Sequence, residues 1–250
     1  MYISIKEPLF CYETGKRKNN EDYIFPAPAT ATEASRLFIV CDGMGGHEDG
    51  EIASKTTAEA IVEYWSANPL QPDDAGKVNQ AIAAAVNKMD RLVEEAKGNI
   101  NMGTTLTLAA IGTESVLVAH AGDSRIYLLR PGAGIIYRSK DHSLVQKWVD
   151  AGWLSPEEAN EHPMSNIITQ VIQPQGQATV FPDVAELKDI KEGDYLFLCS
   201  DGVTESIDDR TLVEIITKRE MPDHEKMNRI KHICLENSTD NHSAYLIPFV

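Results

Sequence analysis

Apolar residues recur at helical spacing in four stretches of the chain. Because residues three and four positions apart share one face of a helix, this spacing predicts amphipathic helices. The stripes are Ile52, Thr56, Ala60, Ile61, Tyr64 and Trp65; Val78, Ile82, Val86, Met89 and Val93; residues 212–218; and Met227, Ile230 and Cys234. Residues 68–76 contain two prolines and two aspartates, so we expect a loop between the first two helices.

Six shorter runs are rich in β-branched or aromatic residues and are bounded by Gly or Asp, which is typical of strands. They cover residues 37–41, 104–111, 116–119, 126–129, 195–199 and 244–249. The predicted strands and helices come in blocks, which favours an α+β fold with antiparallel sheets over a doubly wound parallel sheet. Residues 141–175 carry few strand signals and contain a helix start at Ser155-Pro156-Glu157-Glu158, so they predict a helical insert.

The composition fits one large domain over residues 1–250, because 42% of the 250 residues are apolar. A formal charge of −15 argues against nucleic-acid binding, which needs a basic face, and against docking on an anionic membrane. The four cysteines form no CxxC pair, and the chain shows neither a signal peptide nor the roughly 20 apolar residues of a membrane span. We therefore expect a cytoplasmic protein that acts as a monomer.

Acidic residues recur where predicted strands begin or end. Asp42 and Asp201 precede glycine after an apolar run, Asp123 follows glycine, Asp240 precedes the final run, and Glu21-Asp22 precede Tyr23-Ile24-Phe25. A single Asp-Gly pair is ordinary turn chemistry, but several acids at strand ends suggest that they converge on one point. Clustered carboxylates repel one another unless protons or cations offset the charge. Oxygen ligands suit Mg²⁺ or Mn²⁺, whereas no His or Cys pair has the spacing of zinc ligands.

A set of short motifs runs in order from residue 15 to residue 241. The segments are Gly15-Lys16-Arg17-Lys18-Asn19-Asn20-Glu21-Asp22, Asp42-Gly43-Met44-Gly45-Gly46-His47 with Gly50 and Ala53-Ser54, Met102-Gly103-Thr104-Thr105, Ala121-Gly122-Asp123-Ser124-Arg125, Asp141-His142-Ser143, Cys199-Ser200-Asp201-Gly202 and Asp240-Asn241. Together they resemble the metal-dependent protein phosphatases of the protein phosphatase 2C (PPM) family in their compact bacterial form. Each motif alone is weak, whereas the ordered set is highly specific.

The resemblance implies a four-layer αββα sandwich, in which two packed antiparallel sheets are flanked by helix pairs. It also implies two core ions, Mn²⁺ or Mg²⁺, with Asp42 as the bridging ligand. Asp201 and Asp240 would hold one of these ions, and the Gly43 carbonyl would face the other. Asp123 matches the acid that, with the Asp201 position, binds a third ion in many bacterial members.

The resemblance further implies attack on phosphorus by a water that the two ions bridge and activate. Glu21 and Asp22 would orient metal-bound waters or bind the ions directly, and Arg17 would bind the phosphate with its planar guanidinium. His47 would either protonate the leaving group or only order its loop, and the sequence leaves both roles open. The insert corresponds to the family's flap, and residues 166–173 lack the Arg and Gly common there.

The implied activity is hydrolysis of phosphoserine or phosphothreonine in proteins, opposite a bacterial-type serine/threonine kinase. Three alternatives stay open: a pseudo-enzyme of the same fold, a phosphatase of small phosphorylated molecules, and a purely structural carboxylate-rich domain. The presence of every matched acid argues against the pseudo-enzyme.

Overall fold

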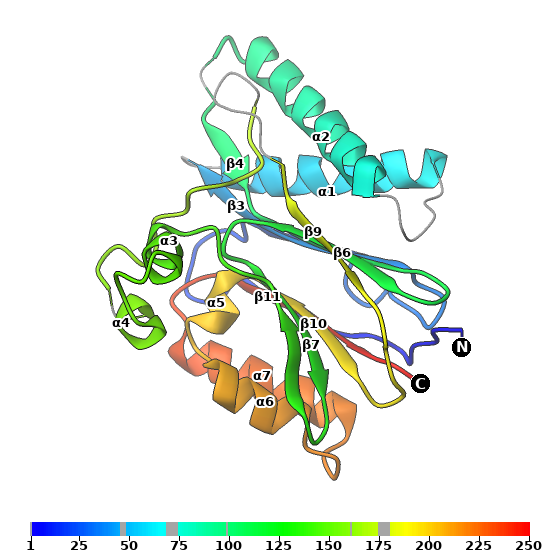
Figure 1. The fold of residues 1–250 in the computed structure, drawn as a ribbon. Coiled ribbons are helices and arrows are strands. Elements are labelled where there is room, and N and C mark those ends of the chain that lie inside the picture. Colours follow the sequence, from blue (N-terminus) through cyan, green and yellow to red (C-terminus); the bar gives the residue numbers. More distant parts are fainter. Residues whose placement is uncertain (1, 46–48, 69–74, 99, 161, 175–180) are drawn as a thin grey trace.

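The computed structural model describes residues 2–45, 49–68, 75–98, 100–160, 162–174 and 181–250. Two antiparallel sheets pack face to face at its centre (Figure 1). The first sheet has the strand order β1 (Leu9–Glu13), β11 (His242–Pro248), β10 (Tyr195–Cys199), β7 (Arg125–Arg130) and β8 (Gly134–Arg138). The second sheet has the order β2 (Asp22–Phe25), β3 (Leu37–Gly45), β5 (Leu106–Ile111), β6 (Val116–Ala121) and β9 (Asp183–Leu187), with β4 (Met102–Thr104) paired to β3.

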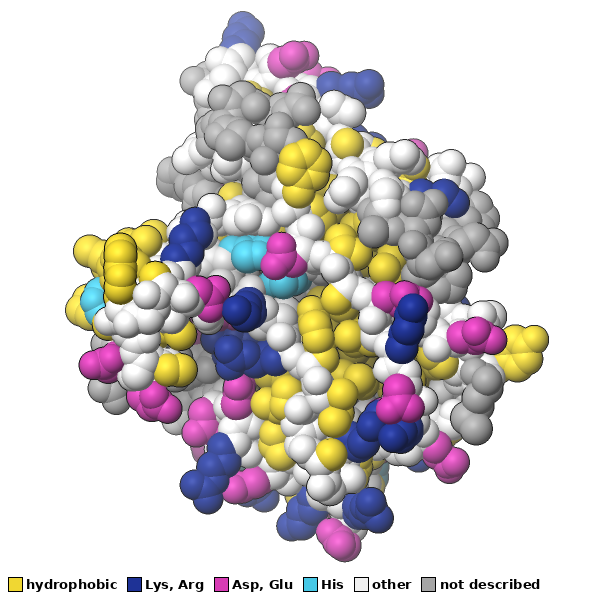
Figure 2. All heavy atoms as spheres, in the orientation of Figure 1, with side chains coloured by type: hydrophobic (Ala, Val, Ile, Leu, Met, Phe, Trp, Pro, Cys, Tyr) yellow, Lys and Arg dark blue, Asp and Glu magenta, His cyan; other side chains and the backbone are white. Residues whose placement is uncertain are grey.

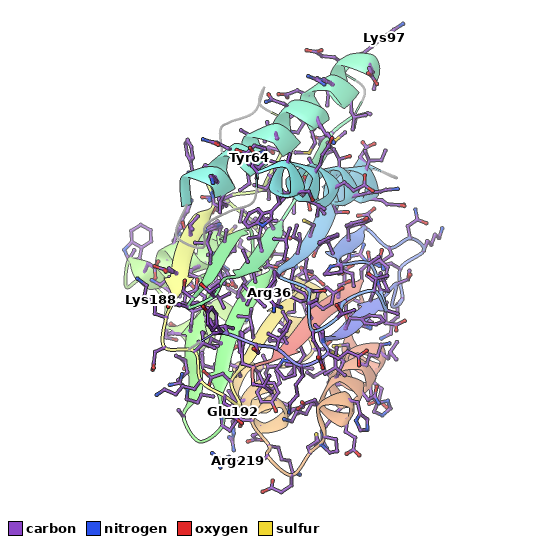
Figure 3. All side chains as sticks on the ribbon, turned by 90° about the vertical axis from the view of Figure 1, so that its right-hand side faces the viewer. Arg36, Tyr64, Lys97, Lys188, Glu192 and Arg219 are labelled. Carbon is purple, nitrogen blue, oxygen red and sulfur yellow. The ribbon has the colours of Figure 1, made fainter. Side chains whose placement is uncertain are left out.

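Helix pairs cover the outer faces of the two sheets (Figure 1). Helices α1 (Asp49–Ala67) and α2 (Ala75–Glu95) lie on the second sheet, and α6 (Asp209–Ile216) and α7 (Asp223–Asn237) lie on the first. Tyr64 lies where α1 and α2 meet (Figure 3), and its hydroxyl donates to Gln80. The expected α+β fold with four layers is confirmed. In the described part of the chain, no helix is long and apolar enough to cross a membrane.

Strand β3 shows why the apolar run before the first Asp-Gly is continuous. Successive side chains of a strand point to opposite faces. Phe38 and Val40 therefore pack between the two sheets, whereas Ile39 and Cys41 pack against the layer of α1 and α2. Because all four side chains are fully buried, the strand needs apolar residues on both faces.

The predicted run 104–111 is divided into two strands. β4 pairs with the end of β3, and β5 pairs with its beginning, so Thr105 lies between the two. β1, β8 and β9 were not predicted, because their alternation of buried and partly exposed residues is weak. The expected loop 68–76 falls largely outside the described residues, and α2 already begins at Ala75.

The helical insert, residues 141–175, leaves the body of the fold after β8 and is described up to residue 174. It contains α3 (Leu144–Asp150) and α4 (Pro156–Asn160). Ser143 caps α3 by accepting the Gln146 N–H, as expected for an N-cap serine. Isolated β-bridges join Ser143 to Ile168 and Ile172 to Thr104. The return segment of the insert is therefore attached to β4, beside the end of β3.

Candidate active site

Most of the predicted acids meet at one edge of the sandwich, where strands from both sheets end. Asp42 lies near the end of β3, Asp201 begins the short helix α5 (Asp201–Thr204) directly after β10, and Asp240 precedes β11 (Figure 1). A cavity of about 680 Å³ opens there, and its lining includes these three acids together with Glu21 and Gly43. The fold thus gathers side chains from opposite ends of the chain around one space.

Asp22 is the buried neighbour of Asp42 across the β2–β3 pair. Its Oδ2 accepts a hydrogen bond of 2.8 Å from the Ser200 hydroxyl. The same Ser200 oxygen accepts the Ser243 N–H at 3.0 Å. Ser243 lies in β11 of the first sheet and Ser200 directly follows β10, so this chain of hydrogen bonds joins Asp22 of the second sheet to the first sheet.

The acids carry raised pKa values, first because they are buried and then because they repel one another. The pKa of Asp42 lies well above its usual range, since burial is reinforced by the charges of Asp201 and Asp22. Burial, with an added contribution from the Asp201 charge, raises the pKa of Asp22 and of Asp123 to about 7 each. Burial also raises the pKa of Asp201. If all four of these carboxylates are ionised, their mutual repulsion requires a compensating positive charge.

Three of these acids also have an oxygen without a partner. The Oδ1 atoms of Asp22, Asp123 and Asp201 are buried and accept no hydrogen bond among the described residues. Leaving a buried charged acceptor unpaired is costly. Divalent cations that prefer oxygen ligands would satisfy these atoms and offset the charge. The donor set therefore fits Mg²⁺ or Mn²⁺.

The backbone of Asp42 is fixed by the threonines at the break between β4 and β5. The Asp42 N–H donates to Thr105 Oγ1 at 3.0 Å, and the Asp42 carbonyl accepts the Thr105 N–H at 2.8 Å and the Thr104 hydroxyl at 2.8 Å. Thr105 Oγ1 also lies 2.7 Å from the Ser124 hydroxyl. From the sequence, Thr105 stands out only as part of the motif Met102-Gly103-Thr104-Thr105. The interruption of the strand at this residue becomes visible only in the fold.

Two glycines allow the close packing around Glu21. A Cβ on Gly43 would lie 2.0 Å from the Gly50 carbonyl oxygen and 2.6 Å from the Glu21 carbonyl oxygen. A Cβ on Gly50 would lie 2.7 Å from Glu21 Oε2. The Ser54 hydroxyl donates to the Glu21 carbonyl at 2.6 Å. The start of α1 therefore packs directly against the segment that carries Glu21, with no space for side chains between them.

Arg17 lies at the edge of the cavity beside Asp240. Its Nη2 donates to Asp240 Oδ2 at 2.6 Å, and 57% of its side chain is exposed. Glu205, which sequence reasoning missed, lies near the same acids: burial raises its pKa, and the charges of Asp201 and Asp240 add to the effect. Its position four residues after Asp201, one helical turn along, is the signal that could have identified it.

Two predicted acids of the described residues, Asp22 and Asp123, are not part of the cavity lining. Asp123 lies in the connection between β6 and β7, and its charge acts on Asp42. It is therefore near the other acids but outside the lining. His47 lies outside the described residues, and its two alternative roles stay predictions.

The insert contributes one wall of the cavity through Asn166 and Ile168. Its entry is fixed by a bidentate ion pair, in which Arg125 Nε and Nη2 donate to the two carboxylate oxygens of Asp141 at 2.7 and 2.6 Å. Hydrophobic side chains gather over α3 and α4 (Figure 2). The exposed large apolar residues of the insert are Trp153, Met164 and Ile167.

His120, His142 and Asp183 form a second group of possible ligands. Among the described residues, this is the set with three ligand atoms within 4.8 Å of one another. The imidazole rings stack with centroids 4.6 Å apart and an interplanar angle of 18°, so their in-plane lone pairs lie in two nearly parallel planes. His142 Nδ1 accepts the Gly122 N–H at 3.2 Å, and its Nε2 faces Asp183 at 3.4 Å. We interpret this group as packing at the base of the insert.

Comparison with known proteins agrees with this geometry. The family model "Protein phosphatase 2C" matches residues 14–231. A putative protein phosphatase 2C-type of Streptococcus pyogenes is 34% identical, covering 99% of this chain and 97% of that protein. Protein phosphatase PhpP of Streptococcus pneumoniae is 37% identical, covering 81% of this chain and 80% of that protein.

Solved structures show the same fold. The Mycobacterium tuberculosis serine/threonine phosphatase PstP/Ppp superposes with a TM-score of 0.83 at 31% identity, covering 98% of each chain. The PstP catalytic domain in complex with two manganese ions gives a TM-score of 0.81 at 30% identity, covering 99% of each chain. Buried carboxylates beside an arginine, on this two-sheet sandwich, define a phosphate-ester hydrolase. The chain belongs to the protein phosphatase 2C family.

Proposed function

We propose that this chain hydrolyses phosphoserine and phosphothreonine in proteins with Mn²⁺ or Mg²⁺ as cofactor. It would reverse a bacterial-type serine/threonine kinase in the cytoplasm. Residues 1–250 would form one catalytic domain, and the helical insert would be its flap. The observation that carries this proposal is the group of buried carboxylates, three of them with an unpaired oxygen, that line or adjoin a cavity which Arg17 also lines.

The positions of the acids support the following ligand roles. Asp42 has acids from both sheets around it and would be the ligand shared by two ions, with Asp201 and Asp240 completing one shell. The Gly43 carbonyl would face the second ion. Bound ions would neutralise negative charge at the phosphate and lower the pKa of water. Asp123, with Asp201, would hold a third ion.

The remaining residues would orient water at the ions or bind the substrate phosphate. Asp22, fixed by Ser200, and Glu21, fixed through its backbone by Ser54, would orient waters at the ions. Arg17 would bind the phosphoryl oxygens, because its exposed guanidinium reaches the acids from the cavity edge. If His47 acts as an acid, it would donate a proton to the leaving serine or threonine oxygen.

Asn substitutions of the central acids test the function. Asp42→Asn and Asp201→Asn keep side-chain size but remove a charged ligand, so we expect Mn²⁺-dependent hydrolysis of p-nitrophenyl phosphate to fall at least about 100-fold in a folded protein. Asp189→Asn is the matched control, because Asp189 is 74% exposed and its ion pairs with Arg130 and Lys191 lie on the surface. Near wild-type turnover in either core variant would refute the metal assignment.

Substrate class is tested separately on the wild-type protein. Phosphothreonine and phosphoserine peptides are compared with small phosphorylated metabolites at equal concentration, with Mn²⁺ and with a chelator. We expect faster turnover of the peptides, and loss of turnover with the chelator. Preference for metabolites would contradict the protein-phosphatase function, and turnover that survives the chelator would contradict the metal requirement.

A further inference from the structure

Asn241 makes three hydrogen bonds from a buried side chain that has so far been given no role. Its Nδ2 donates to the Thr14 carbonyl at 2.8 Å and to the Asn19 carbonyl at 2.9 Å. Its Oδ1 accepts the Glu21 N–H at 2.8 Å. Only 5% of the residue is exposed. One amide therefore joins the segment before β11 to three positions near the start of the chain.

Two of these positions are the two ends of the segment that carries Arg17. We call residues 14–19 the arginine loop. The loop turns tightly, since the Arg17 N–H donates to the Thr14 carbonyl at 3.3 Å and Gly15 has a φ of +61°. A Cβ on Gly15 would lie 2.3 Å from the Asp240 carbonyl oxygen. The loop thus packs directly on the segment that contains Asp240 and Asn241.

The Arg17 side chain depends on this backbone for its position. With 57% of the side chain exposed, the guanidinium is restrained by its ion pair with Asp240 more than by packing, and the place of the loop decides where it can reach. Asparagine suits the task chemically, because one NH₂ group supplies two donors and the carbonyl supplies an acceptor. Aspartate of the same shape would direct an unprotonated oxygen at two carbonyl oxygens.

We propose that Asn241 is a positioning residue that sets the distance between the phosphate-binding Arg17 and the ion-binding carboxylates. The preceding residue, Asp240, belongs to the carboxylate group, so adjacent residues of one segment fix both halves of the site. Asn241 lines the cavity, but the three hydrogen bonds of its amide all go to backbone groups, so it acts through the arginine loop. This inference rests on the proposed function, in which Arg17 binds the substrate phosphate.

A double-mutant cycle tests the inference. Arg17→Ala, Asn241→Ala and the double variant are compared with the wild type at saturating Mn²⁺, with p-nitrophenyl phosphate and a phosphothreonine peptide. If Asn241 acts through Arg17, Asn241→Ala lowers kcat/KM about 10- to 100-fold in the wild type but less than about twofold in the Arg17→Ala background. Losses that multiply independently would overturn the positioning role.

Two further measurements separate positioning from general damage. Inorganic phosphate, used as a competitive inhibitor, should bind at least about fivefold more weakly to Asn241→Ala, whereas the Mn²⁺ affinity measured by calorimetry stays within about twofold. Asn237→Ala is the matched control, because its amide donates to Ile233 on the surface of α7 and lies in no site. Unchanged phosphate inhibition in Asn241→Ala would refute the inference.

Asn241→Asp serves if the alanine variant does not fold, because it keeps the size of the side chain and removes the donors to Thr14 and Asn19. The same cycle with Arg17→Ala then applies, and the effect of Asn241→Asp should again nearly disappear in the Arg17→Ala background. Independent losses in that cycle again overturn the role. A wild-type protein without metal-dependent turnover would defeat the proposed function, whereas independent losses on an active wild type would defeat only the role of Asn241.

Discussion

At the scale of single residues, the site depends on two glycines that lack a side chain as much as on the acidic side chains. Gly43 and Gly50 bring two backbone segments so close that neither position has room for a methyl group. The same closeness places Gly43 and Glu21 beside one cavity. Glycine is required at both positions because a side chain would collide with the neighbouring segment. Backbone conformation is not the reason, since neither residue has a positive φ.

Gly43→Ala tests this requirement. The added methyl group would lie 2.0 Å from the Gly50 carbonyl oxygen, so the backbone must move, at a cost of about 2 kcal/mol or more in the free energy of unfolding. We expect a matching loss of activity, measured by thermal unfolding and Mn²⁺-dependent hydrolysis. Gly103→Ala is the control, since its nearest neighbour would lie at an ordinary 3.5 Å. Equal effects at both positions would contradict this account.

Asp123 allows a second test at this scale. Its carboxylate acts on Asp42 from outside the cavity lining, so we expect Asp123→Ala to lower turnover about tenfold and to remove the third ion. The two core ions should remain. Calorimetric titration with Mn²⁺ counts the ions. An unchanged count together with an unchanged rate would remove Asp123 from the site.

At the scale of elements, the break between β4 and β5 frees the Thr105 hydroxyl to support the site. A continuous strand would pair regularly with β3 and would leave Thr105 as one more ladder residue. The break instead directs Thr105 Oγ1 to the Asp42 N–H and to Ser124. The connection that carries Asp123 is thereby tied to the backbone of Asp42.

Thr105→Val tests this link, because it keeps the shape of the side chain and removes the hydroxyl. We expect activity to fall about 10- to 100-fold, with a stability loss of about 1 kcal/mol. Thr107→Val is a matched control on β5, since its hydroxyl is also buried and donates only to the Val40 carbonyl among the contacts described. It should lose similar stability and keep its activity. Similar loss of activity in both variants would show that packing alone is responsible.

The sequence predicted the strand ends and the acidic residues better than it predicted the residues that hold those acids in place. Asp42 and Asp201 follow buried apolar runs, so local pattern was enough to place them at strand ends. The role of Thr105 depends on which strands pair, which is a property of the tertiary fold, whereas the spacing of Glu205 from Asp201 was present in the sequence. The edge strands β8 and β9 were not predicted because their side chains are partly exposed on both faces, which weakens the alternation of apolar and polar residues.

At the scale of the whole molecule, the raised pKa values make stability depend on pH. The pKa of Asp22 and of Asp123 is about 7 in the folded protein against an ordinary value of 3.8. Between these values the folded state binds more protons than the unfolded state, so the free energy of unfolding falls as pH rises through this window. Bound cations would remove this penalty.

The corresponding experiment measures Tm at pH 5 and pH 8, with a chelator and with Mn²⁺. We expect the metal-free protein to have the lower Tm at pH 8, and Mn²⁺ to raise Tm more at pH 8 than at pH 5. Asp123→Asn should reduce the pH dependence, and Asp189→Asn should not, which separates the buried acids from the net charge of −15. A metal-free Tm that increases from pH 5 to pH 8 would contradict the prediction.

Asp42 lines the cavity from the second sheet with Asp22 buried beside it, whereas Asp201 and Asp240 lie next to β10 and β11 of the first sheet. Ions shared among them would therefore act as a cross-link between the two halves of the sandwich. A small slide of one half over the other would change the spacing of every ligand at once. Substitutions deep between the sheets, such as at the contact of Phe38 with Tyr245, would then alter cation affinity from a distance.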